Sequence, residues 1–392
     1  MKNLIVSLLL FSMVFCAMSQ REYQTILQQV EENNTALNVL RQRMKSQKLN
    51  NRTGIFPSNP EVEFNYLWGS PKMIGNRVDL SVKQSFDFPT VYSHRNKIAA
   101  LQNNNVECTY QIERLDLLLG AKQICIKLIY YNTLDKMYEK RLDNAKLIAD
   151  AYRFKWETGE TNILEYNKAQ LNLLSVQTEK MRIKTEQTTL LAQLKGLNGG
   201  KEIAFSDDLY PDDTLPVDFE QWYLSAEENN PILQYVYGQI EIDKQQLKLN
   251  RALSLPKFSA GYMNEKVRGE QFQGLKLSMT VPFWEHKNNV KQAKAQLTFS
   301  ESSLEDGKIQ FYNRLKNVYA KAFVLEKNIA EIKRSMSLYS NESLIKKALD
   351  AGEISLLNYI QEINYYYEVM NMLLETERDF KLTVSELFAV EL

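Results

Sequence analysis

Residues 61–68 read EVEFNYLW and residues 77–88 read RVDLSVKQSFDF, and apolar side chains occupy almost every even-numbered position of both stretches. An alternation with a period of two is typical of a β-strand whose two faces meet different surroundings. The segment between them, GSPKMIGN, is rich in residues that favour turns. The sequence therefore predicts a β-hairpin. Because a lone hairpin is only marginally stable in water, its apolar face needs a covering partner.

The sequence on either side of this hairpin has a strongly helical pattern. From about residue 22 to 51, apolar residues recur at spacings of three and four, and Asn33-Asn34 is expected to interrupt this helix without ending it. After the hairpin, one helix is predicted over 90–152 and a second over 163–197. Joined by a glycine-containing turn, these two helices would form a long antiparallel pair.

The sequence then starts again, at a spacing near 195 residues. The motif Glu-Glu-Asn-Asn occurs at 31–34 and returns at 227–230, inside a helix predicted over 219–254. Two further alternating strands follow at 257–264 and 274–283, and then a helix from about 285 to 349, a turn and a last helix. One unit of helix–strand–strand–helix–helix is therefore present twice.

Four segments are expected: a secretory signal peptide at 1–19, a first repeat at 20–197, a linker at 198–217 and a second repeat at 218–392. Lys2 precedes an apolar run that ends in a small-x-small site, which is typical of a signal peptide. Cys16 could carry a lipid, but the bulky Phe15 before it fits a lipoprotein cleavage site poorly. The aspartates of the linker favour solvated turns over a calcium loop, because they lack EF-hand spacing.

Composition excludes several functional classes. Lysine and arginine together number 48, as do aspartate and glutamate, so no basic excess points to nucleic acid. The two histidines, His94 and His286, have no nucleophile or metal-ligand spacing around them, so we expect neither an enzyme nor a metal or cofactor site. Cys108 and Cys125 are interpreted as small buried apolar residues.

The four strands, of about eight to twelve residues each, suit an outer-membrane β-barrel. Open sheet edges cannot sit in lipid and known barrels begin at about eight strands, so several copies of the chain would have to share one barrel. The helices carry too many charges to lie in lipid. An alternative is a secreted periplasmic coiled-coil scaffold without a channel, which explains the helices but gives no reason for strands with two different faces.

The facing of the hairpin follows from its alternation. The apolar positions Val62, Phe64, Leu80 and Val82 are expected to face lipid, and Glu63, Asp79, Ser81 and Lys83 the lumen. Aromatic residues gather at the strand ends, as an interfacial girdle requires: Tyr66, Trp68, Phe86, Phe88, Phe283 and Trp284.

The whole mature chain resembles the TolC family of outer-membrane efflux and export channels. The resemblance rests on the duplicated order, on Glu-x-Asn-Asn at helix starts, and on the strand ends FDFP at 86–89 and TVPF at 280–283 that lead into long helices. It also rests on the two matching turns GETNILEY at 159–166 and GEISLLNY at 352–359. The compact length and short loops look like the heavy-metal (CusC/CzcC-like) branch of tripartite resistance-nodulation-division pumps.

The resemblance implies a mainly helical chain with a small membrane β part, assembled as a homotrimer with a 12-stranded β-barrel that a long α-helical barrel continues. Such a channel lies in outer-membrane lipid with its helices in the periplasm. It passively exports substrates, which an inner-membrane transporter delivers through a periplasmic adaptor. For the heavy-metal branch these substrates would be metal ions.

The resemblance also assigns two sets of residues. The adaptor docks at the turns between paired helices, which here carry Gly159, Glu160, Ile163, Leu164, Gly352, Glu353, Leu356 and Leu357. Pore or gate candidates are Glu165, Asn358 and Gln361. The family's tip aspartates correspond here to Asn358 and Gln361, and its linking tyrosine and arginine to Leu349 and Ile354, so a salt-bridged lock is not expected.

Overall fold

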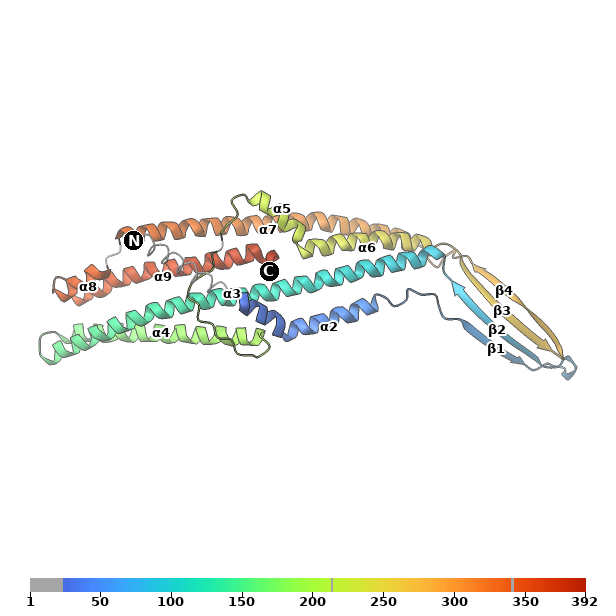
Figure 1. Cartoon of the computed structure of the whole chain (residues 1–392), viewed down its shortest axis with the longest axis horizontal. Coiled ribbons are helices and arrows are strands. Elements are labelled where there is room, and N and C mark those ends of the chain that lie inside the picture. The colour runs from blue at the N-terminus through green and yellow to red at the C-terminus, as the bar shows by residue number, and fades with distance from the viewer. Residues whose placement is uncertain (1–23, 213, 340–341) are drawn as a thin grey trace, which may run out of the picture. The chain divides into compact units, whose positions relative to one another are not determined.

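A computed structural model describes residues 24–212, 214–339 and 342–392 (Figure 1). The predicted signal peptide at 1–19, with Cys16, lies outside the described residues. The chain divides into two compact units. The sheet unit comprises Val39–Ile112 and Glu227–Phe311, and the hairpin unit comprises the chain up to Asn38 with Glu113–Ala226 and Tyr312–Leu392. Each unit therefore contains segments from both repeats.

The sheet unit is built on one antiparallel sheet of four strands in the order β1-β2-β3-β4. The strands are β1 (Glu61–Leu67), β2 (Arg77–Phe86), β3 (Lys257–Val267) and β4 (Glu270–Thr280), with the short helix η1 (Lys72–Ile74) in the first turn. Figure 1 shows the four strands side by side. The two hairpins join because β2 pairs with β3, with Leu80 opposite Asn264. The duplicated strands thus form one sheet.

The second hairpin differs in its bounds from the strands predicted at 257–264 and 274–283. Its turn is the pair Arg268-Gly269, both with positive φ, so the ladder continues three residues beyond the predicted end of β3. β4 ends at Thr280 rather than at Phe283, because Pro282 has no N–H to donate. The strands predicted at 61–68 and 77–88 end one and two residues earlier, at Leu67 and Phe86.

Four helices or parts of helices complete the sheet unit. They are α2 (Thr35–Asn50), the first part of α3 (Pro89–Glu157), α6 (Pro231–Leu253) and the first part of α7 (Asn289–Tyr339). A buried cluster forms where α3 and α6 pack together near the sheet: Val91, Ile98, Ile242, Leu249 and Ala252.

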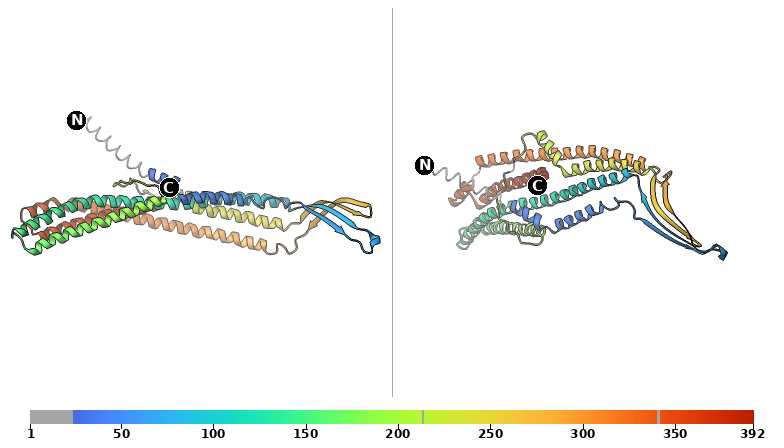
Figure 2. Two further views of the ribbon diagram at one scale, coloured as in Figure 1. Left: turned by 90° about the horizontal axis from the view of Figure 1, so that it is seen from below. Right: turned by 45° about the vertical axis from the view of Figure 1, so that its right-hand side comes forward.

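The hairpin unit is entirely helical apart from its connections. It contains a helix over residues 24–33, the later parts of α3 and α7, and five further elements: α4 (Ile163–Leu197), α5 (Phe219–Asn229), α8 (Glu342–Asp350), α9 (Leu356–Leu387) and η2 (Phe388–Glu391). Figure 2 shows the pair α3/α4 lying beside the pair α8/α9. One cluster joins the two pairs, with Ile148 and Ala169 packed on Leu356, Tyr359 and Ile363.

The repeated Glu-Glu-Asn-Asn motif ends a helix in both repeats, which corrects two predictions. The first helix stops at residue 33 and α2 begins at Thr35, and the helix predicted over 219–254 is broken into α5 and α6. In each motif the last asparagine is buried and caps the next helix. Asn34 accepts a hydrogen bond from the Leu37 amide at 2.9 Å, and Asn230 accepts from the Leu233 amide at 3.1 Å.

Replacing the capping asparagines is expected to destabilise the chain. Asn34→Ala and Asn230→Ala each leave buried amide groups without an acceptor, so each should lower the free energy of unfolding by about 1–2 kcal/mol. Chemical denaturation of the purified protein measures this. Glu228→Ala is the matched control, because Glu228 lies two residues before the cap and its side chain is exposed. An equal loss in the control would show that the cap is not the cause.

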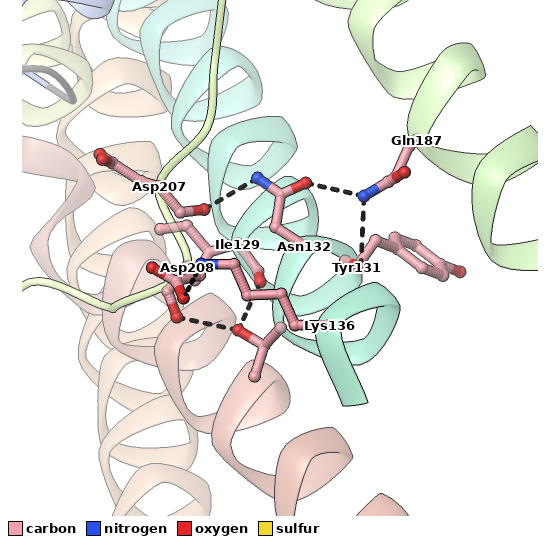
Figure 3. A network of polar contacts seen from close by, with 8 residues as sticks. Ile129, Tyr131, Asn132, Lys136, Gln187, Asp207 and Asp208 are labelled. Atoms are coloured by element: carbon pink, nitrogen blue, oxygen red, sulfur yellow. Dashed lines mark hydrogen bonds and ion pairs between the residues drawn. The ribbon is translucent and has the colours of Figure 1, made fainter. Parts of the chain in front are cut away.

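The backbone of the linker between the repeats accepts hydrogen bonds from side chains of α3 (Figure 3). The Asn132 side-chain amide donates to the Asp207 carbonyl and the Thr133 hydroxyl to the Asp208 carbonyl, both at 2.8 Å. Gln187 of α4 donates to Asn132 at 2.8 Å, so α3, α4 and the linker share one network. The Asp208 carboxylate pairs with Lys136, a use that supports the turn interpretation of these aspartates.

Candidate membrane face and docking tips

One face of the sheet is apolar over most of its length. Antiparallel partners point to the same side, so the register places Val62, Val82, Tyr262 and Leu275 in one cross-strand row and Phe86, Phe258 and Met279 in another. Nothing in the described chain covers this face: Leu275 is 86% and Leu277 80% exposed. Such a continuous exposed apolar surface marks contact with a membrane or a partner.

The opposite face of the same sheet carries most of its charged side chains, and several of them form ion pairs. Arg77 contacts Asp79 at 2.8 Å on its own strand and Glu265 at 3.1 Å on β3. Lys83 contacts Glu61 across the β1–β2 pair at 2.8 Å. The apolar and polar faces predicted for the first hairpin are thus present, and they extend over a four-stranded sheet.

Both edges of the sheet are open within the described chain, because β1 and β4 each pair with one neighbour. A free edge presents unpaired N–H and C=O groups, which a further strand can satisfy. Of the helices in the described residues, none is both long enough and apolar enough to span a membrane.

The turn between α3 and α4 forms the first tip. Gly159 has a φ of 77° and follows the end of α3, where the Glu160 amide donates to the Lys155 carbonyl at 2.7 Å. Asn162 then caps α4 by accepting from the Glu165 amide at 3.0 Å. These stop and start signals hold the Glu160 backbone at the apex and leave its side chain exposed.

The turn between α8 and α9 forms the second tip and repeats this geometry. Gly352 has a φ of 74°, the Glu353 amide donates to the Ala348 carbonyl at 2.9 Å, and Ser355 caps α9. Glu353 is exposed, as Glu160 is. The structure therefore brings one carboxylate to the same place on each of two equivalent turns.

The apolar residues predicted for docking behind the two turns differ in burial. Leu164 and Leu357 are 66% and 48% exposed, so both are available to a partner. Leu356 is only 1% exposed because it packs in one buried cluster with Ile148 of α3. Its counterpart Ile163 is 45% exposed.

The gate candidates lie just behind the tips. Glu165 forms an ion pair with Lys168 at 3.2 Å, whereas the side chains of Asn358 and Gln361 are exposed on α9. Leu349 and Ile354, where the resemblance implied no salt-bridged lock, pack against the apolar cluster that joins the helix pairs. Near its turn, the α8/α9 pair is therefore held by apolar contacts.

A polar link between the helix pairs involves Arg141, which the sequence reasoning did not single out. The guanidinium of Arg141 on α3 lies between two aromatic rings, 4.4 Å from the ring centre of Tyr138 and 3.9 Å from that of Tyr367 on α9. It also donates to the Asn371 side chain at 3.0 Å. Its spacing from Tyr138, Ala145 and Ile148 on the buried side of α3 was the available signal.

The histidine and cysteine side chains weighed for catalysis or metal binding have surroundings that suit a structural role. His94 contacts the Gln245 side chain at 3.2 Å, and Cys125 is buried in the apolar core, where burial raises the pKa of its thiol to about 12. A thiol with so high a pKa is a poor nucleophile at neutral pH. The described residues include no group of three or more His, Cys, Asp or Glu side chains placed to hold a metal ion.

Comparison with solved structures finds the same fold in several bacterial channels. The Campylobacter jejuni CmeC outer membrane channel superposes with a TM-score of 0.78 at 14% identity, covering 94% of this chain and 85% of that one. CusC gives 0.78 at 14% identity, with 94% and 92% covered. The outer membrane protein VceC from Vibrio cholerae gives 0.77 at 12%, with 94% and 96% covered. No family model and no curated protein matches the sequence significantly.

The fold implied by the resemblance is therefore confirmed: the chain is mainly helical, carries a four-stranded antiparallel sheet, and has the duplicated fold of TolC-type outer-membrane channels. Of these neighbours, CmeC is an outer membrane channel and CusC forms a transmembrane channel.

Proposed function

We propose that this chain forms the outer-membrane exit duct of a tripartite efflux pump, as a homotrimer with its helices in the periplasm. The observation that carries the proposal is the sheet of the sheet unit. Its apolar face is uncovered, its other face carries most of the charges, and both edges are open. A barrel of several such sheets in lipid satisfies all three features, because closure pairs the edges and lipid covers the apolar face.

The number of chains follows from the strands. Each chain supplies four strands, and two chains would make an eight-stranded barrel whose interior side chains nearly fill it. Three chains give twelve strands and an open lumen. The mass of the detergent-purified protein, corrected for bound detergent, tests this; a single chain would contradict the proposal, and a pair would rule out the open duct.

The duplicated helices supply a second argument for more than one copy. The tip glycines align the repeats, so that Ile163 of α4 matches Leu356 of α9 and Leu174 matches Tyr367. Leu356 and Tyr367 pack within the cluster between the helix pairs of one chain, whereas Ile163 and Leu174 are exposed. The same face is therefore covered in one repeat and open in the other.

A matching open surface exists on the second repeat. A 330 Å³ cavity lies between α7, α8 and α9, lined on one side by Tyr339, Ile345, Tyr365 and Val369. It occupies the part of the second repeat that corresponds to the groove where α3 and α4 receive α9 in the first. We infer that α4 of a second copy enters here, which would continue the alternation of repeats around a closed ring.

Charged substitutions on the open face of α4 are expected to weaken the trimer. Ile163→Glu and Leu174→Glu should each cost about 1–3 kcal/mol per chain–chain interface, because a carboxylate replaces an apolar group that association buries. The measurement is the temperature at which the purified trimer dissociates.

Leu164→Glu is the matched control for these variants. Leu164 adjoins Ile163 and is exposed, but its counterpart Leu357 is also exposed, so the repeat gives no reason for a chain–chain contact there. Dissociation at the same temperature in all three variants would contradict the assigned interface.

The tips are the proposed site of adaptor docking. Glu160 and Glu353 offer one exposed carboxylate on each turn, with Leu164 and Leu357 beside them as apolar contacts. Ile163 is assigned to the neighbouring copy. Glu165, Asn358 and Gln361 are proposed to line the narrow end of the duct, where apolar packing rather than ion pairs closes the tips.

The exported substrate is supplied by the pump, since the proposed duct is passive. Metal-ion cargo rests on the compact length and short loops alone, because CmeC and CusC superpose equally well. The competing scaffold function leaves the exposed apolar sheet without a covering partner. Membrane fractionation separates the two: a scaffold is released by a salt wash, whereas a channel needs detergent and conducts ions in a planar bilayer.

A further inference from the structure

The apolar face of the sheet carries one charged residue among its described strand positions, and it lies near the turn end. By register this face comprises Val62, Phe64, Tyr66, Val78, Leu80, Val82, Gln84, Phe86, Phe258, Ala260, Tyr262, Asn264, Lys266, Gln271, Gln273, Leu275, Leu277 and Met279. Lys266 lies opposite Val78 and Gln271, in the second cross-strand row from the turns. The neighbouring row is also polar, with Asn264 and Gln273.

The two turns at this end add two more cations. Lys72 begins η1 in the β1–β2 turn, and Arg268 occupies the β3–β4 turn. The Arg268 side chain lies over Gly75, where a Cβ in place of the glycine hydrogen would stand 2.4 Å from the Arg268 Cγ, so the two turns are in contact. Residues 68–76 and 268–269 contain no acidic residue. Within the described residues, Lys72, Lys266 and Arg268 have no ion pair.

The acidic residues of this end, Asp79, Glu265 and Glu270, all belong to the other face by register, with Glu270 opposite Val267 in the row nearest the turns. Asp79 and Glu265 are engaged by Arg77 on the polar face. On the side of the apolar face, Tyr66 and Trp68 form an edge-to-face pair at 5.5 Å, and Trp68 is largely exposed. An aromatic pair beside an unpaired cation is typical of a membrane–water boundary.

The opposite end of the same face differs. Its last row is Phe86, Phe258 and Met279, which has no charged or amide side chain. The face is therefore asymmetric along the strands. Toward the helices of the sheet unit it has no charged residue and, apart from Gln84, is apolar, whereas toward the turns it is polar and carries an unpaired cation. A membrane with equally charged boundaries would not require this asymmetry.

We propose that Lys72, Lys266 and Arg268 bind the phosphate groups of a phosphorylated glycolipid in the outer leaflet, at the turn end of the barrel. This inference rests on the proposed function, which places the helices in the periplasm and the turns outside. Lysine and arginine stems extend along apolar surface while their charges reach the headgroups. Each cation near an anionic surface strengthens binding about fivefold, so the three together contribute on the order of 100-fold.

The experiment uses the full-length trimer in phosphatidylcholine vesicles, with bisphosphorylated lipid A or its dephosphorylated form added. The wild-type trimer should dissociate at a higher temperature with bisphosphorylated lipid A and show little change with the dephosphorylated form. In the Lys72→Gln/Lys266→Gln/Arg268→Gln variant, the lipid A concentration that gives half of this shift should rise on the order of 100-fold.

A control variant carries Lys83→Gln and Lys276→Gln, two cations of the polar face, and should respond to lipid A as the wild type does. An undiminished response in the triple variant, or an equal response to dephosphorylated lipid, would overturn the headgroup site. Ion conductance in phosphatidylcholine alone distinguishes failure of the glycolipid site from failure of the proposed function. A conducting wild type that ignores lipid A refutes the glycolipid site alone, whereas a wild type that neither inserts nor conducts refutes both.

Discussion

An arginine in place of Leu80 is expected to prevent assembly in the membrane, whereas an arginine in place of the adjacent Ser81 is expected to be tolerated. Leu80 lies on the apolar face, opposite Phe64 on β1, and is exposed to whatever surrounds the sheet. A cation on the lipid side of a barrel costs about 2–4 kcal/mol near the bilayer midplane. The cost would apply in each of the three chains of a trimer, so its effect on assembly is large.

Ser81 supplies the matched control because it differs from Leu80 by one position and points to the other face. It lies opposite Glu63, so an arginine there would find a carboxylate across the strand pair. The measurement is the fraction of protein recovered from outer membranes as a detergent-resistant trimer. Equal loss for both variants, or loss for Ser81→Arg alone, would contradict the facing of the sheet.

Reversing the charge at both tips is expected to abolish export without affecting assembly. In the double variant Glu160→Lys/Glu353→Lys, each chain exchanges two exposed carboxylates for two ammonium groups, and the trimer exchanges six. Like charges placed against a partner surface that had accepted carboxylates cost several kcal/mol. The glycines and caps that shape the turns are unchanged, so the tips themselves should fold normally.

Crosslinking to the adaptor and pump-dependent resistance are the two measurements, and both should be lost. Glu326→Lys/Glu331→Lys makes the same change in charge on the exposed surface of α7, away from the turns, and should preserve both. Recovery of the trimer from outer membranes should be normal in each variant. Normal crosslinking and resistance in the tip variant would remove the two carboxylates from the docking site.

The sequence by itself determined the features that depend on local chemistry. The alternation in residues 61–88 predicted both strands and their two faces, because a strand presents successive side chains to opposite sides whatever it packs against. The duplication and the two glycine turns were equally readable, since positive φ favours glycine at both tips. These features already pointed to the channel fold.

The ends of helices and strands were harder to predict from the sequence, because they depend on competing local signals. The sequence pattern predicted an interruption within one helix at Asn34 and an unbroken helix at Asn230. In the structure one helix ends at each asparagine, and the buried asparagine side chain caps the next helix. The tight Arg268-Gly269 turn falls within a longer predicted loop, because only the pairing of β3 with β4 shows how far the ladder extends.

Only the tertiary structure decided which equivalent positions are buried. Ile163 and Leu356 occupy the same place in their repeats and have similar side chains, yet their exposures are 45% and 1%. Burial depends on what packs against a residue: Leu356 packs in a cluster with Ile148 of α3, whereas Ile163 belongs to no such cluster and stays largely exposed. The joining of β2 to β3 and the Arg141 contact with Tyr367 were decided in the same way, because they bring together residues far apart in the sequence.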